Sequence, residues 1–137
     1  MNENSRTTER AVEKWATAAE AGFQTLPDIL LKKQVELGLS PTDMLVLMNI
    51  TMHWWYRDQL PFPRSGTIAE RIGADPRTVQ RSIRKMQDLG LIERETETLE
   101  DGSTRSVLNL AGLVDRLSRF AKTDRDYLAR QQRRKVA

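Results

Sequence analysis

The feature that most constrains this chain is a capped amphipathic segment at residues 74–90, ADPRTVQRSIRKMQDLG. Its apolar residues recur at steps of four and three, the repeat of one α-helical face: Val79, Ile83, Met86 and Leu89. Asp75 followed by Pro76 is typical of a helix start, and Gly90 is typical of a helix end. We therefore predict a helix over residues 76–89 that buries one face.

The other face of this predicted helix is basic, with Arg77, Arg81, Arg84 and Lys85. Charge is also unevenly distributed along the chain. Residues 64–88 contain six basic and three acidic residues, and residues 91–110 contain two basic and five acidic ones. Residues 111–137 contain eight basic and three acidic residues. The net charge of +3 names no partner by itself. Basic charge is thus gathered in two blocks with an acidic segment between them.

A shorter helix is predicted just before this one, in SGTIAERIG, residues 65–73. Ser65 is its expected N-cap, and Gly73 supplies the turn with positive φ between the two helices. Beyond Gly90, residues 91–99 and 104–110 read as strands around the turn EDGS. Asp-Gly between two such runs is a strong signal for a β-hairpin.

Further helices are predicted on both sides of this unit. Residues 7–21 form an alanine-rich amphipathic helix around Trp15, and a short helix starts at Pro27. Ser40 caps a helix that runs to about Arg57 and is apolar on nearly every side, which predicts a buried central helix.

At the C-terminal side, Leu113, Leu117 and Phe120 share one helical face from Ala111 onward. This helix either continues or restarts at Thr123. We expect the helix with Trp15 and the helix with Leu113 to form a homodimer interface; the alternative is that they fold back on their own domain.

Several classes of site are excluded or disfavoured by composition. The chain has no cysteine, which excludes disulfides, thiolate zinc sites and cysteine nucleophiles. The single histidine, His53, is interpreted as a packed, hydrogen-bonded imidazole, and Trp54 and Trp55 as core residues. We find no phosphate-binding glycine loop and no Ser–His–Asp set, and expect no enzyme activity, metal or cofactor. The longest apolar run is too short for a bilayer, and a secretion signal is lacking, so we expect a cytoplasmic protein.

The stretch LSPTDMLVLMNI…LPFPRSGTIAERIGADPRTVQRSIRKMQDLGLIERE resembles the winged helix-turn-helix proteins of bacteria. GntR-like and MarR-like regulators are similar, as are the N-terminal domains of plasmid and phage replication initiators and DnaD-like proteins. The resemblance implies a mainly α fold with a small β-hairpin wing and extra N- and C-terminal helices. The expected units are an N-terminal helical arm (1–25), a winged helix-turn-helix domain (26–118, motif 65–90, wing 91–110) and a basic C-terminal helix or tail (119–137).

The resemblance also implies that the helix 76–89 reads the major groove of double-stranded DNA. Arginine can bind guanine with two donors and glutamine can bind adenine, while the start of the preceding helix suits a phosphate. The alternative is a solvated basic helix face. The expected DNA-binding residues are Arg64, Ser65, Thr67, Arg77, Thr78, Gln80, Arg81, Arg84, Lys85 and Arg105.

The expected wing departs from the family pattern because its tip is acidic, with Glu100 and Asp101. Such a tip either stands off the DNA or meets a basic protein partner, including the chain's own arginine-rich end. We predict a sequence-specific transcriptional regulator. Two alternatives stay open: a plasmid or phage replication or partition factor that binds origin repeats, and a winged-helix interaction module without a DNA role.

Overall fold

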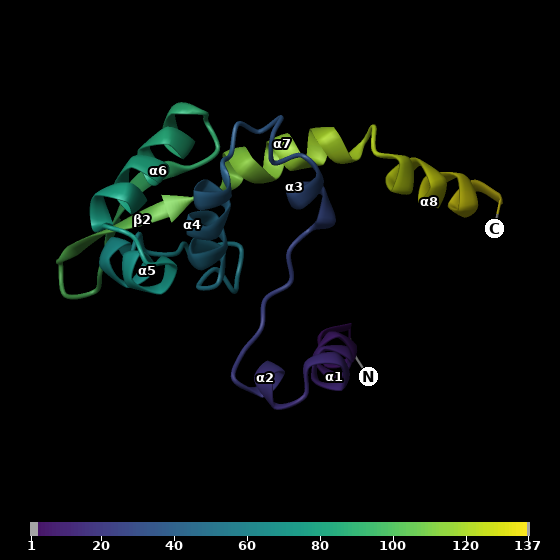
Figure 1. The fold of residues 1–137 in the computed structure, drawn as a ribbon, viewed down its shortest axis with the longest axis horizontal. Coiled ribbons are helices and arrows are strands. Elements are labelled where there is room, and N and C mark those ends of the chain that lie inside the picture. The colour runs from purple at the N-terminus through teal and green to yellow at the C-terminus, as the bar shows by residue number, and fades with distance from the viewer. Residues whose placement is uncertain (1–2, 137) are drawn as a thin grey trace.

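The computed structural model describes residues 3–136 of the chain, with side chains from residue 5 (Figure 1). The elements are α1 (Glu3–Trp15), α2 (Thr17–Glu20), α3 (Asp28–Lys32), α4 (Pro41–Thr51), α5 (Ser65–Ile72), α6 (Pro76–Asp88), β1 (Glu93–Thr98), β2 (Thr104–Asn109), α7 (Ala111–Ala121) and α8 (Arg125–Val136). The prediction of a mainly α fold with a β-hairpin wing and extra terminal helices is confirmed. No helix in the described part is both long and apolar enough to cross a membrane.

The elements divide into a packed body and two projections, as Figure 1 shows. Helices α3 to α7 and the hairpin form the body. An extended segment separates α1 and α2 from it, and α8 lies beyond the end of α7, at the opposite end of the long axis from the hairpin. The C-terminal end of the chain therefore reaches away from the helices that form the core, whereas the segment after α2 is tied to α4, because Gln24 donates to the Met48 carbonyl at 2.9 Å.

Helix α6 is anchored by the face that its periodicity predicted. Val79, Ile83 and Met86 are all fully buried and belong to one core cluster with residues of α4, α5 and α7. Ala69 of α5 is also buried, and its small side chain lets α5 lie against α6. The opposite, basic face of α6 is thereby turned away from the body.

The predicted extent and burial of α4 are wrong. The helix begins as expected with a capping box between Ser40 and Asp43, but it ends at Thr51 instead of near Arg57. Leu45 is 48% exposed and Trp55 is 74% exposed, whereas Trp54 is half-buried against the core. The body has partners for only one side of α4, so an apolar run all round the helix does not produce burial all round it.

The N-terminal arm is two helices where a single one was predicted. Ala16 has φ 55°, in the left-handed region, and it separates α1 from α2. Trp15 is 63% exposed. Its indole thus remains available on the surface of this chain, next to Lys14, whose ammonium lies 5.7 Å from the ring centroid.

At the C-terminal side, α7 folds back on its own domain. Leu113 and Leu117 are buried and Phe120 packs against the core. The expectation that this face forms a dimer interface is therefore wrong, because the body already covers it. The chain restarts as α8 at Arg125 after a break at 122–124, so of the two alternatives left open by the sequence the structure shows the restart.

The hairpin is a two-stranded antiparallel ribbon in which Glu93 pairs with Asn109 and Thr98 with Thr104. Val107 and Leu108 of β2 are buried, whereas nearly all of β1 is exposed. Gly102 at the turn has φ 87°, as the Asp-Gly signal requires. The wing is thus attached to the body mainly through β2.

Candidate nucleic-acid interface

The start of α6 is fixed by a tight turn and a side-chain cap. Gly73 ends α5 with φ 67°, and the amide of Ala74 bonds back to the carbonyl of Ala69. Asp75 then accepts a hydrogen bond of 2.7 Å from the Arg77 amide, with Pro76 in the first turn of α6. The predicted Asp-Pro cap and glycine turn are confirmed. They leave the first turn of α6 at the surface.

The outward face of α6 carries side chains that are free to meet a ligand. Arg77, Gln80, Arg81 and Arg84 are exposed, and Thr78 is half-buried. Within residues 3–136, no hydrogen bond or ion pair is made by the guanidinium groups of Arg77, Arg81 and Arg84. Arg77 and Arg81 are one helical turn apart, so they lie on one stripe. This stripe presents two unpaired guanidinium groups of the described chain on the surface of the body.

Lys85 differs from these arginines because its ammonium is paired with a buried carboxylate, although its own side chain is 46% exposed. Its ammonium donates to Oδ2 of Asp43 at 2.6 Å, and the hydroxyl of Ser82 donates to Oδ1 of the same carboxylate at 2.6 Å. Asp43 is only 4% exposed. A phosphate contact of Lys85 stays a prediction, and a phosphate would have to compete with this carboxylate.

The same carboxylate closes the capping box of α4, accepting from the Ser40 amide at 2.9 Å. Burial would raise the pKa of Asp43, but the hydrogen bonds from Lys85, Ser82 and Ser40 outweigh it and hold the pKa below its ordinary value. Asp43 thus joins the start of α4 to the middle of α6. The sequence does not predict this link, since no local pattern pairs residues 42 positions apart.

The start of α5 provides a second group of donors. Arg64, and not Ser65, occupies the N-cap position, with φ 38° and ψ 42°, and no side chain caps the helix. The prediction of Ser65 as N-cap is wrong because Arg64 is already in a left-handed conformation there. The first-turn amides near Ser65 and Thr67 thus have no side-chain acceptor, which suits an oxyanion such as phosphate.

Arg64 and Arg105 both lie against Phe62. Their guanidinium carbons are 5.2 Å and 4.1 Å from the ring centroid. Arg105 also pairs with Glu97 across the hairpin at 3.0 Å. The structure therefore brings Arg105 next to the start of α5, but with its charge balanced by Glu97 of the wing itself. A role of Arg105 in DNA binding stays a prediction.

The wing tip is acidic and exposed. Asp101 accepts from the amide and hydroxyl of Ser103, and these bonds lower the pKa of its carboxyl. Arg94 donates to Ser106 at 3.1 Å. The basic α8 lies at the opposite end of the long axis (Figure 1), so within one chain it does not meet this tip.

His53 lies near Phe62 and near the two arginines that contact this ring, Arg64 and Arg105. Its Nε2 is buried and has no hydrogen-bond partner among the described residues, so the expected hydrogen bond at that atom is absent. Burial, followed by the charges of Arg64 and Arg71, lowers the pKa of His53. The imidazole is therefore neutral at pH 7 and packs edge-on against Trp55, at 6.1 Å between ring centroids.

Comparison with known proteins agrees with this geometry. Residues 37–92 match the family model described as a helix-turn-helix domain. The crystal structure of the N-terminal domain of DnaD protein from Geobacillus kaustophilus HTA426 is similar, with a TM-score of 0.59 and 22% identity, covering 88% of this chain and 94% of that one. The resemblance to winged helix-turn-helix proteins is thereby confirmed, and the helix-turn-helix match supports a DNA-binding role.

A second solved structure is titled "Possible transcriptional regulator from Methanosarcina mazei Go1". Its TM-score is 0.44 at 16% identity, covering 78% of this chain and 85% of that one, which is too low to bear on the argument. No curated protein matches the chain.

Proposed function

We propose that this protein is a sequence-specific double-stranded DNA-binding protein that reads the major groove with α6 and controls transcription. It acts by binding, not by catalysis, and in the cytoplasm. The observation that carries the proposal is the stripe of Arg77 and Arg81. These are two exposed guanidinium groups without partners among the described residues, on a helix whose opposite face is buried. A rigidly held helix with free arginines near its N-terminus has the geometry of a recognition helix.

The side chains on α6 divide into two roles by position. Arg77, Gln80 and Arg81 lie in the N-terminal half, which enters a groove most deeply. Arginine there suits guanine O6 and N7, and glutamine suits adenine. Arg84 lies a turn later and is closer to phosphates. The amides at the start of α5, with Arg64, add a phosphate contact that positions α6 without reading sequence.

A homodimer would raise the affinity by placing two α6 helices on half-sites one or more turns apart. Since α7 is covered by its own body, we infer that the exposed face of the N-terminal arm, with Trp15, supplies the interface. Inverted repeats in promoters would support transcription control, whereas repeats at a replication origin would support the replication or partition alternative.

A second candidate function is a protein-interaction module, which the wing favours. Glu97 balances Arg105, and the tip residues Glu100 and Asp101 would be repelled by phosphate. This alternative leaves the unpaired arginines of α6 without a role.

Replacing Arg81 by Ala tests the proposal against that alternative. Loss of a bidentate guanine contact is expected to weaken binding to a selected duplex by about 1–3 kcal/mol and relax the preference at one base pair. Arg84→Ala is the comparison, since loss of a phosphate contact weakens all duplexes alike and lowers the salt slope by about one. Both variants are titrated on selected and scrambled duplexes at two salt concentrations. Equal losses on the two duplexes for Arg81→Ala would show that α6 clamps phosphates without reading sequence.

A further inference from the structure

Helix α8 is a basic element that has no role in the packing of the body. None of its residues is buried, and beyond its first turn it lies clear of the other helices (Figure 1). Asp126 is its one acidic residue, against five basic ones: Arg125, Arg130, Arg133, Arg134 and Lys135. A short helix with so little packing and so much like charge is marginal by itself, so a partner of opposite charge would stabilise it.

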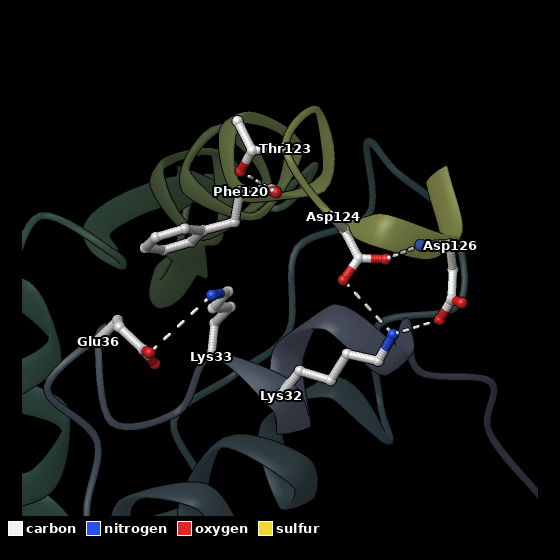
Figure 2. Close-up of polar contacts among 7 residues, drawn as sticks. All are labelled: Lys32, Lys33, Glu36, Phe120, Thr123, Asp124 and Asp126. Carbon is white, nitrogen blue, oxygen red and sulfur yellow. Dashed lines mark hydrogen bonds and ion pairs between the residues drawn. The ribbon is translucent and has the colours of Figure 1, made fainter. Parts of the chain in front are cut away.

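The body holds α8 at its start through one lysine, as Figure 2 shows. The Lys32 ammonium lies 2.6 Å from Asp126 Oδ2 and 3.4 Å from Asp124 Oδ1. Asp124 also caps α8 by accepting from the Asp126 amide at 3.1 Å. The hydrogen bond from Lys32, together with its charge, lowers the pKa of Asp126. The two carboxylates at the start of α8, those of Asp124 and Asp126, are therefore already paired with Lys32.

The arginines farther along α8 are not paired with a carboxylate at contact distance, although the charge of Arg130 also helps to lower the pKa of Asp126. Arg130, Arg133 and Arg134 are spaced at i, i+3 and i+4, so they share one face. In the described chain none of them forms an ion pair, and the one hydrogen bond from their side chains runs from Arg133 Nε to the Ala129 carbonyl at 3.5 Å. This arginine face projects from the body as an array of donors over about one helical turn.

We propose that α8 contacts the phosphates of duplex DNA that flanks the segment occupied by α6. This inference rests on the proposed function, because α6 brings the duplex to the molecule. Charge complementarity favours phosphates over the acidic wing of a second copy. Two of the wing's carboxylates already have partners within the hairpin, Glu97 with Arg105 and Glu95 with Asn109. Since α7 carries α8 away from α6 (Figure 1), the contact falls outside the groove that α6 occupies.

The test uses the full chain with Arg130, Arg133 and Arg134 replaced by Gln. The control replaces Arg57, Arg119 and Lys122 by Gln, which removes the same charge from exposed sites in the 52–64 loop and at the end of α7. Binding to random-sequence duplexes of about 12 and about 30 base pairs, one and three helical turns, is measured from low to moderate salt. Each lost phosphate contact lowers the log–log salt slope by about 0.9.

On the long duplex, the α8 variant is expected to lose about 2–3 units of salt slope while the control keeps the slope of the parent. On the short duplex, the α8 variant and the parent should bind alike. An unchanged slope on the long duplex, or equal losses in the α8 variant and the control, would overturn the inference and leave the role of α6 intact. The inference would also be overturned if the α8 variant lost self-association in sedimentation but kept the salt slope of the parent, because a second copy would then be the partner. Failure of the parent to bind either duplex would overturn the proposed function as well.

Discussion

Replacing Gly112 by Ala is expected to destabilise the protein by about 3 kcal/mol or more, at the upper end of the cost of overpacking a core. Gly112 lies in the first turn of α7, where the helix meets the chain between α6 and the hairpin. A Cβ built there would lie 2.0 Å from the Gly90 carbonyl oxygen and 3.3 Å from that of Leu91. These are backbone atoms, and the Leu113 amide donates to the Leu91 carbonyl at 2.9 Å. Moving either α7 or the segment 90–91 to make room would therefore strain this hydrogen bond.

Gly66→Ala is the matched control for this substitution. Gly66 lies in α5, and a Cβ there would meet no atom within 4 Å. Ala favours a helix over Gly, so this variant should be as stable as the parent or more stable by up to about 1 kcal/mol. Urea denaturation of the three proteins provides the comparison. A Gly112→Ala protein as stable as the parent would show that α7 does not approach Gly90 as described.

Replacing Asp43 by Ala is expected to cost about 2–4 kcal/mol of unfolding free energy, from the lost helix cap and the lost hydrogen bonds to a charged acceptor. The change removes the capping box of α4 and leaves Ser82 and Lys85 without their common acceptor. Asp101→Ala is the control, because that carboxylate lies at the exposed wing tip. Its loss should leave the stability nearly unchanged.

The contribution of Asp43 to the unfolding free energy should also depend on pH. The pKa of its carboxyl is lower in the folded protein than in the unfolded chain, where it is about 3.9. Its contribution is therefore complete above that pH and is lost as the pH falls through the lowered folded pKa. The stability gap between the parent and Asp43→Asn should be constant from pH 7 to about 5 and narrow below about 4. A gap that stays constant to pH 3 would contradict the assignment.

The elements near α6 were predictable because their signals are local. The Asp75-Pro76 cap, Gly73 and the apolar spacing of Val79 and Ile83 each act within a few residues, and each is found as expected. The Asp-Gly turn of the hairpin is of the same kind. Such features follow from backbone sterics and helix periodicity alone.

Features that depend on the surroundings were not predictable. The apolar run of α4 contains no information on which side lacks a neighbour, so the exposure of Leu45 and Trp55 was missed. The bond between Lys85 and Asp43 joins two helices far apart in sequence. Because of that bond, Lys85 differs from Arg81 and Arg84, although all three lie on the same basic helix face.

Selection of binding sites from a random-sequence duplex pool tests the central claim most directly, because only a protein that reads base edges enriches a motif. The parent is expected to enrich a short motif in a few rounds, with guanine preferred at one position or more. The Arg77→Ala/Arg81→Ala double variant should retain binding but lose that preference. A pool bound by the parent that stays as random as the unbound pool would contradict sequence-specific reading by α6.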